Sequence, residues 1–144
     1  MMSTQLQSAL ATTADLYTPL LLILAVMDVA LAFRRGFKFH GLRLLLAVLV
    51  VYGWMFADKH FHWWSGFDLD YSTHTAASLA LIMCLWPRKT LILRCLLAVS
   101  LIFYGELMNT LNYHSWADML TTAAVVAISF SVPVQIQARL FPRT

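Results

Sequence analysis

The sequence predicts an all-α fold, a polytopic transmembrane bundle of about five helices that forms a single domain over residues 1–144. Two observations predict it. Apolar residues make up 60% of the chain and charged residues only 12%, which is about half the charged fraction of a typical soluble protein. The apolar residues also gather in five stretches separated by short polar segments. This composition excludes a secreted disulfide scaffold, a disordered tail and a nucleic-acid-binding domain.

The five apolar stretches differ in length. A bilayer core of roughly 30 Å needs about 20 helical residues. The first stretch, residues 16–33, ends at a basic loop, and the fourth and fifth cover residues 91–111 and 116–134. The second and third, residues 42–57 and 73–86, are short for a complete crossing. We therefore expect the ends of these two spans to sit in the interfacial region of the membrane.

The basic residues predict the orientation of the bundle. Nine of the ten Lys and Arg residues follow the first, third or fifth span, and only Lys59 lies in an alternate connection. The positive-inside rule makes the basic face cytoplasmic, so the amino terminus is expected outside and the carboxyl terminus inside. We expect an integral protein of a bacterial inner membrane with a site that faces the periplasm. The nine residues are Arg34, Arg35, Lys38, Arg43, Arg88, Lys89, Arg94, Arg139 and Arg143.

The outer side collects acidic, aromatic and histidine residues. Ionisable groups at membrane depth are costly and therefore mark candidate functional sites. His74 opens the third predicted span, His114 and Asp118 open the fifth, and Glu106 lies in the outer part of the fourth, with Asn109 nearby. We expect these groups to share one outward-facing pocket. The other outer residues are the acids Asp15, Asp58, Asp68 and Asp70 and a predicted aromatic belt of Trp63, Trp64, Tyr113 and Trp116.

The spacing of His114 and Asp118 favours catalysis. Residues four apart share one face of a helix, and a carboxylate that accepts the imidazole N–H fixes the tautomer that a nucleophilic or basic histidine requires. His74 precedes His114 by one helical hairpin. This arrangement predicts two histidines facing each other, one attacking and one protonating a leaving group.

The same residues also fit a structural interpretation. Ser115 to Asp118 spell S-x-x-D, a pattern typical of a capping box that satisfies free N–H groups at a helix start. Ser72 is likewise a candidate N-cap of the third span.

Two short motifs resemble segments of the type 2 phosphatidic acid phosphatase superfamily. The sequence D-Y-S-T-H-T-A at 70–76 resembles the P-S-G-H-T segment, with Thr73 in place of the usual glycine. The sequence Y-H-S-W-A-D at 113–118 resembles the later H-x-x-x-D segment, and both are also similar to the sphingomyelin synthase branch. The resemblance covers residues 59–124.

The resemblance implies a role for each matched residue. His114 would attack phosphorus, Asp118 would orient it, and His74 would protonate the departing lipid alcohol. Ser72 and the backbone amides around Thr73 would hold phosphate oxygens, in agreement with the preference of helix amino termini for anions.

Two arginines of the family are absent, because their positions hold Gly66 and Met108. We expect Lys59, His60 and His62 to supply part of the missing positive charge, or the substrate to be a less charged diester. The predicted function is thus a lipid phosphatase or phosphotransferase that needs no cofactor and acts on a phospholipid or polyprenyl phosphate. A homo-oligomer is compatible with this prediction, and a nucleic-acid partner is not.

Two alternatives remain open. A metal-dependent membrane hydrolase would build a zinc site from outer residues, chosen among His60, His62, Asp68, Asp70, His74 and His114. A non-catalytic adaptor or transport subunit would use Asp28 in the first span for an ion path or an interhelical hydrogen bond, with Asn109 as a packing polar group.

Overall fold

A computed structural model describes residues 4–35 and 39–140, and every regular element in these ranges is helical. The all-α prediction is therefore confirmed for the described part of the chain. The elements in order are α1 (Thr4–Arg34), α2 (Phe39–Phe61), the 3-10 turn η1 (Ser65–Phe67), α3 (Thr73–Leu85), the 3-10 turn η2 (Trp86–Arg88), α4 (Leu91–Thr110) and α5 (Trp116–Leu140).

Four of these helices are long and apolar enough to cross a membrane, namely α1, α2, α4 and α5. The chain is accordingly a helical membrane bundle. Its first helix begins twelve residues before the predicted span, because the polar start of α1 is helical too. The hydroxyls of Thr12 and Thr13 donate to the carbonyls of Ser8 and Ala9, four residues earlier, so these side chains are accommodated on the helix itself.

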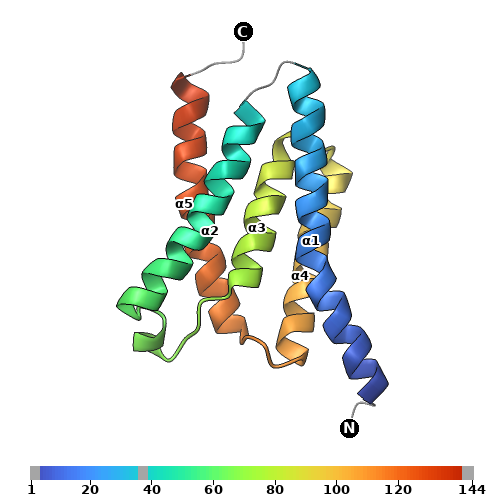
Figure 1. Cartoon of the computed structure of the whole chain (residues 1–144), viewed down its shortest axis with the longest axis vertical. Coiled ribbons are helices and arrows are strands. Elements are labelled where there is room, and N and C mark those ends of the chain that lie inside the picture. The colour runs from blue at the N-terminus through green and yellow to red at the C-terminus, as the bar shows by residue number, and fades with distance from the viewer. Residues whose placement is uncertain (1–3, 36–38, 141–144) are drawn as a thin grey trace.

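Successive helices run in opposite directions along the bundle (Figure 1). One end holds the end of α1, the start of α2, the α3–α4 connection and the last residues of α5. We call it the basic end, because it carries Arg34 and Lys89. The opposite end holds the start of α1 and the α2–α3 and α4–α5 connections. We call it the site end, because the candidate functional residues lie there.

The shortest helix, α3, occupies the centre. Its 13 residues rise about 20 Å, less than the bilayer core of roughly 30 Å. All four longer helices contact it, and Ala76, Ser78 and Ala80 have no exposed surface. Because protein surrounds α3, its length need not match the thickness of the lipid hydrocarbon.

An ion pair fastens α1 to the α3–α4 connection at the basic end. Nζ of Lys89 lies 2.9 Å from Oδ1 of Asp28, and the side chains are 26% and 11% exposed. Asp28 thus pairs with a residue of a connection, and its expected use in an ion path or an interhelical hydrogen bond stays a prediction. On the other side of α3, the indole of Trp54 donates to the hydroxyl of Ser129 and joins α2 to α5.

Candidate functional site

A capping box starts α5. The hydroxyl of Ser115 accepts from the backbone N–H of Asp118 at 3.2 Å, and Oδ2 of Asp118 accepts from the backbone N–H and hydroxyl of Ser115 at 2.8 and 2.7 Å. This reciprocal pattern satisfies N–H groups that the first turn of a helix leaves free. The structural interpretation of the S-x-x-D motif is confirmed.

The same carboxylate also holds the α2–α3 connection. Oδ1 of Asp118 accepts from the backbone N–H of Asp70 at 2.9 Å. One turn further along α5, the hydroxyl of Thr122 accepts from the backbone N–H of Ser72 at 3.1 Å. Asp118 and Thr122 therefore fix the approach of the chain to the amino terminus of α3.

Ser72 is the N-cap of α3. Its hydroxyl accepts from the backbone N–H of Thr75 at 3.3 Å and donates to the Thr75 hydroxyl at 2.9 Å. Ser72 is fully buried, so both of its polar groups serve the protein interior. In this structure the residue expected to hold phosphate is a helix cap, while Thr73, the next residue, is partly exposed.

His114 faces Asp70. Nδ1 of His114 lies 3.5 Å from Oδ2 of Asp70, and the two side chains are 12% and 74% exposed. Nδ1 is buried and has no hydrogen-bond partner among the described residues. A mostly buried imidazole thus lies beside an exposed carboxylate.

The position of His114 corrects one expectation. Because Ser115 caps α5 and the helix begins at Trp116, His114 lies in the α4–α5 connection and shares no helical face with Asp118. Among the described residues, the carboxylate paired with the His114 imidazole is that of Asp70. From the sequence, Asp70 was a candidate metal ligand and an outer acid but not the partner of His114, since this pairing depends on how two connections meet in space.

His74 lies on a different face of α3 from the residues that meet α5. It is three residues before Ala77 and seven before Leu81, a spacing that places all three on one helical face. Ala77 and Leu81 face α1 and α2, whereas Ser72 bonds to α5. His74 is exposed, and no hydrogen bond or ion pair joins it to His114 in the described ranges. The expected opposed pair of histidines stays a prediction.

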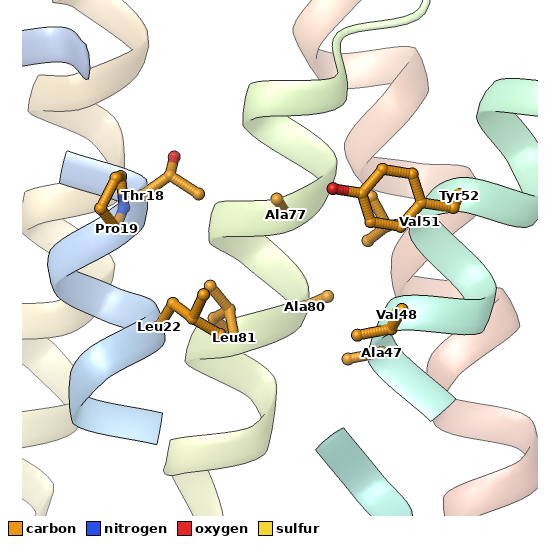
Figure 2. Close-up of a pocket in the computed structure, with 10 residues that line it drawn as sticks. All are labelled: Thr18, Pro19, Leu22, Ala47, Val48, Val51, Tyr52, Ala77, Ala80 and Leu81. Carbon is orange, nitrogen blue, oxygen red and sulfur yellow. The ribbon is translucent and has the colours of Figure 1, made fainter. Parts of the chain in front are cut away.

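The face of α3 that carries His74 borders a cavity of about 260 Å³ between α1 and α2. Figure 2 shows Thr18 and Leu22 of α1 on one side, Val48 of α2 on the other, and Ala77 of α3 between them. The lining is almost entirely apolar. Its lining residues all come from α1, α2 and α3, so neither Asp70 nor His114 lines it.

Lys59, His60 and His62 lie at the site end of α2. All three are exposed, and Figure 1 shows that the ends of α2 and α4 diverge there. The expected compensation for the missing arginines thus depends on side chains at the edge of the bundle.

The segment that follows α2 folds into the bundle. Trp64, expected in an interfacial belt, is only 7% exposed, and its indole donates to the hydroxyl of Thr121 at 3.2 Å. Tyr71 donates to the carbonyl of Val51 at 3.0 Å. Burial, followed by the negative charge of Asp58, raises the pKa of Tyr71 above its ordinary range, which keeps its hydroxyl a neutral donor.

Glu106 and Asn109 flank a close approach between α4 and α5. Glu106 is exposed and Asn109 is partly buried. A Cβ added at Gly105 would lie 3.0 Å from Cη2 of Trp116, so any larger residue there would press against the Trp116 ring. In the described structure, neither Glu106 nor Asn109 has a side-chain hydrogen bond to the Asp70–His114 pair.

The described residues do not form a metal site. They contain no group of three or more His, Cys, Asp and Glu residues arranged to hold a metal ion. The zinc alternative required such a group from His60, His62, Asp68, Asp70, His74 and His114. Of these six, the ion pair described above joins only Asp70 and His114.

Comparison with family models, with curated proteins and with solved structures finds no match for the chain. The assignment of a function therefore depends on the short motifs and on the geometry described above.

Proposed function

We propose that the protein is a membrane-embedded phosphatase or phosphotransferase for a phosphorylated lipid, with His114 as its nucleophile. The observation that carries this proposal is the 3.5 Å pairing of His114 Nδ1 with the Asp70 carboxylate. A carboxylate in this place attracts a proton to Nδ1 and leaves Nε2 free, which is the form of imidazole that attacks phosphorus. The motif resemblance supports the same nucleophile, with Asp70 rather than Asp118 as its positioning residue.

The proposed reaction has two steps. Nε2 of His114 forms a bond to phosphorus as the bond from phosphorus to the lipid oxygen breaks, and the departing oxygen takes a proton from His74. Water or another alcohol then attacks the phosphohistidine and gives its proton to the deprotonated His74, while the His114 imidazole leaves as the neutral base. Because both groups act on one phosphorus atom, the proposal requires the His74 and His114 side chains to meet at the amino terminus of α3.

The membrane arrangement forms part of the proposal. All five helices would cross a bacterial inner membrane, with the basic end in the cytoplasm and the site end in the periplasm. The alternating helix directions support this arrangement, as does the burial of α3, which removes the need for a full hydrophobic length. A phospholipid or polyprenyl phosphate would enter laterally with its phosphate at the site end.

A non-catalytic lipid-binding protein is the second candidate. The use of Asp118 in a helix cap favours it, because this carboxylate is then explained without chemistry. The position of His74 on the face away from α5 favours it too.

The test uses purified protein in lipid nanodiscs, with phosphatidic acid or a polyprenyl phosphate as substrate and glycerol as a second acceptor. Phosphate release and transfer to glycerol are measured, and alkaline quenching traps the phosphohistidine, which acid destroys. We expect His114→Ala to lower turnover by a factor of about 10² or more. Tyr113→Phe, a change at the neighbouring exposed residue, should leave turnover unchanged.

Full turnover by His114→Ala would overturn the assignment of the nucleophile. If the unmodified protein binds lipid but shows neither turnover nor a phosphohistidine, the result would favour the non-catalytic lipid-binding protein. Loss of turnover in EDTA, restored by added zinc, would instead support a metal-dependent hydrolase.

A further inference from the structure

We infer that the cavity between α1 and α2 binds one hydrocarbon chain of a membrane lipid, with the polar head of that lipid beside His74. The cavity of about 260 Å³ is half enclosed by Leu22 of α1, Val48 of α2 and Ala77 and Leu81 of α3 (Figure 2). This inference goes beyond the proposed reaction, because binding of a hydrocarbon chain does not require phosphoryl transfer.

Small side chains create the cavity. Ala47 of α2 and Ala77 and Ala80 of α3 line it. Their methyl groups leave empty the space between α2 and α3 that longer side chains would fill. Protein interiors are close-packed and hold few voids larger than a water molecule. A hollow of this size between helices of a membrane bundle is therefore expected to take up an apolar occupant from its surroundings.

The depth of the cavity identifies that occupant. The lining residues lie near the middles of α1, α2 and α3, which is where the hydrocarbon core surrounds a spanning helix. Two hydroxyls line the cavity, and that of Thr18 already bonds to the Ser78 hydroxyl at 2.9 Å. Tyr52 carries the other hydroxyl, so the lining offers water few hydrogen-bond partners. Because apolar cavities stay dry, we expect hydrocarbon rather than water here.

His74 marks the polar end of the cavity. It precedes Ala77 by three residues on the same face, which places it about 4.5 Å nearer the site end. The His74 side chain is exposed, and the described structure gives it no hydrogen bond or ion pair. Its imidazole is thus available to a phosphate or hydroxyl at the head of the bound lipid. If the proposed function also holds, the bound lipid is the substrate. Its leaving oxygen then lies beside His74, which donates the proton that this oxygen takes up.

The test is photolabelling in vesicles with a phosphatidic acid that carries a diazirine near the middle of one acyl chain, followed by mass spectrometric mapping. We expect label on peptides that contain Leu22, Val48 and Leu81. Val48→Trp fills the cavity and should lower that labelling several-fold. Val99→Trp on α4 is the matched control, because Val48 and Val99 are 45% and 46% exposed and Val99 lies outside the cavity lining.

Equal labelling of all helices, or no effect of Val48→Trp, would overturn the chain site. His74→Ala should reduce labelling by phosphatidic acid and leave labelling by phosphatidylcholine less affected; equal labelling would overturn the position of the head.

The His114→Ala variant separates this inference from the proposed function. It should label as the unmodified protein does, since His114 does not line the cavity. Specific labelling of the unmodified protein, if that protein shows no turnover, would support the chain site and contradict the enzyme. Turnover by the unmodified protein, together with labelling that Val48→Trp does not change, would support the enzyme and contradict the chain site.

Discussion

Replacing Asp118 by alanine tests whether this carboxylate acts mainly as a structural link. Its two oxygens accept three hydrogen bonds, from the backbone N–H groups of Asp70 and Ser115 and from the Ser115 hydroxyl. A hydrogen bond to a charged group contributes about 1.5 to 3 kcal/mol when shielded, and ordinary ones about 1 kcal/mol. Because Asp70 and Ser115 are exposed, water replaces part of each loss. We expect Asp118→Ala to lower the free energy of unfolding by about 2 to 4 kcal/mol.

The assay is reversible unfolding in mixed micelles of a mild detergent and SDS, followed by circular dichroism. Asp118→Asn keeps one acceptor oxygen and should lose about 1 to 2 kcal/mol, while Thr12→Ala on the exposed start of α1 serves as a control. A normal unfolding curve for Asp118→Ala, together with loss of turnover, would refute this reasoning and return Asp118 to a catalytic role.

Three further predictions concern other parts of the bundle. Asp28→Ala or Lys89→Ala should each destabilise the fold by roughly 1 to 2 kcal/mol, because the remaining charge is partly buried, and the double variant should recover some of that loss; additive losses in the SDS titration would contradict this. Ser65→Cys, in a variant whose two native cysteines are serine, should react with an impermeant maleimide only from the periplasmic side, and cytoplasmic labelling would reverse the orientation. Tyr71→Phe should cost about 1 kcal/mol at pH 8, and its stability should fall less steeply above about pH 10, because the folded protein keeps Tyr71 neutral to a higher pH than the unfolded chain does. Identical pH profiles would show that Tyr71 ionises normally.

The starts of α3, α4 and α5 were the most predictable part of the fold. The predicted spans at residues 73, 91 and 116 begin where α3, α4 and α5 begin. Each start follows a hydroxyl residue that caps the helix, namely Ser72, Thr90 and Ser115. Capping depends on neighbours within a few residues, so the sequence contains the required information. The end of α2 is less predictable, because the helix runs past the apolar stretch through polar residues to Phe61.

The pairing of the candidate site residues was less predictable. His114 and Asp70 meet because the α4–α5 connection lies against the α2–α3 connection, a contact that no local pattern records. The face on which His74 lies depends on which helices surround α3. Because apolar residues are spread around α3 without a clear polar face, its pattern identifies a buried helix without showing which neighbour covers which face.

The central position of α3 has a consequence for how the protein is made. A lone segment with 13 helical residues and polar residues at its start is a weak signal for insertion into a bilayer. Its N-cap residue also bonds to Thr122 of α5, a partner that the ribosome produces about 50 residues later. α3 therefore completes its contacts only after α4 and α5 have been synthesised. Until then the partly made chain has to keep α3 beside α1 and α2, so a stop codon before α5 should leave a product that membrane quality control removes.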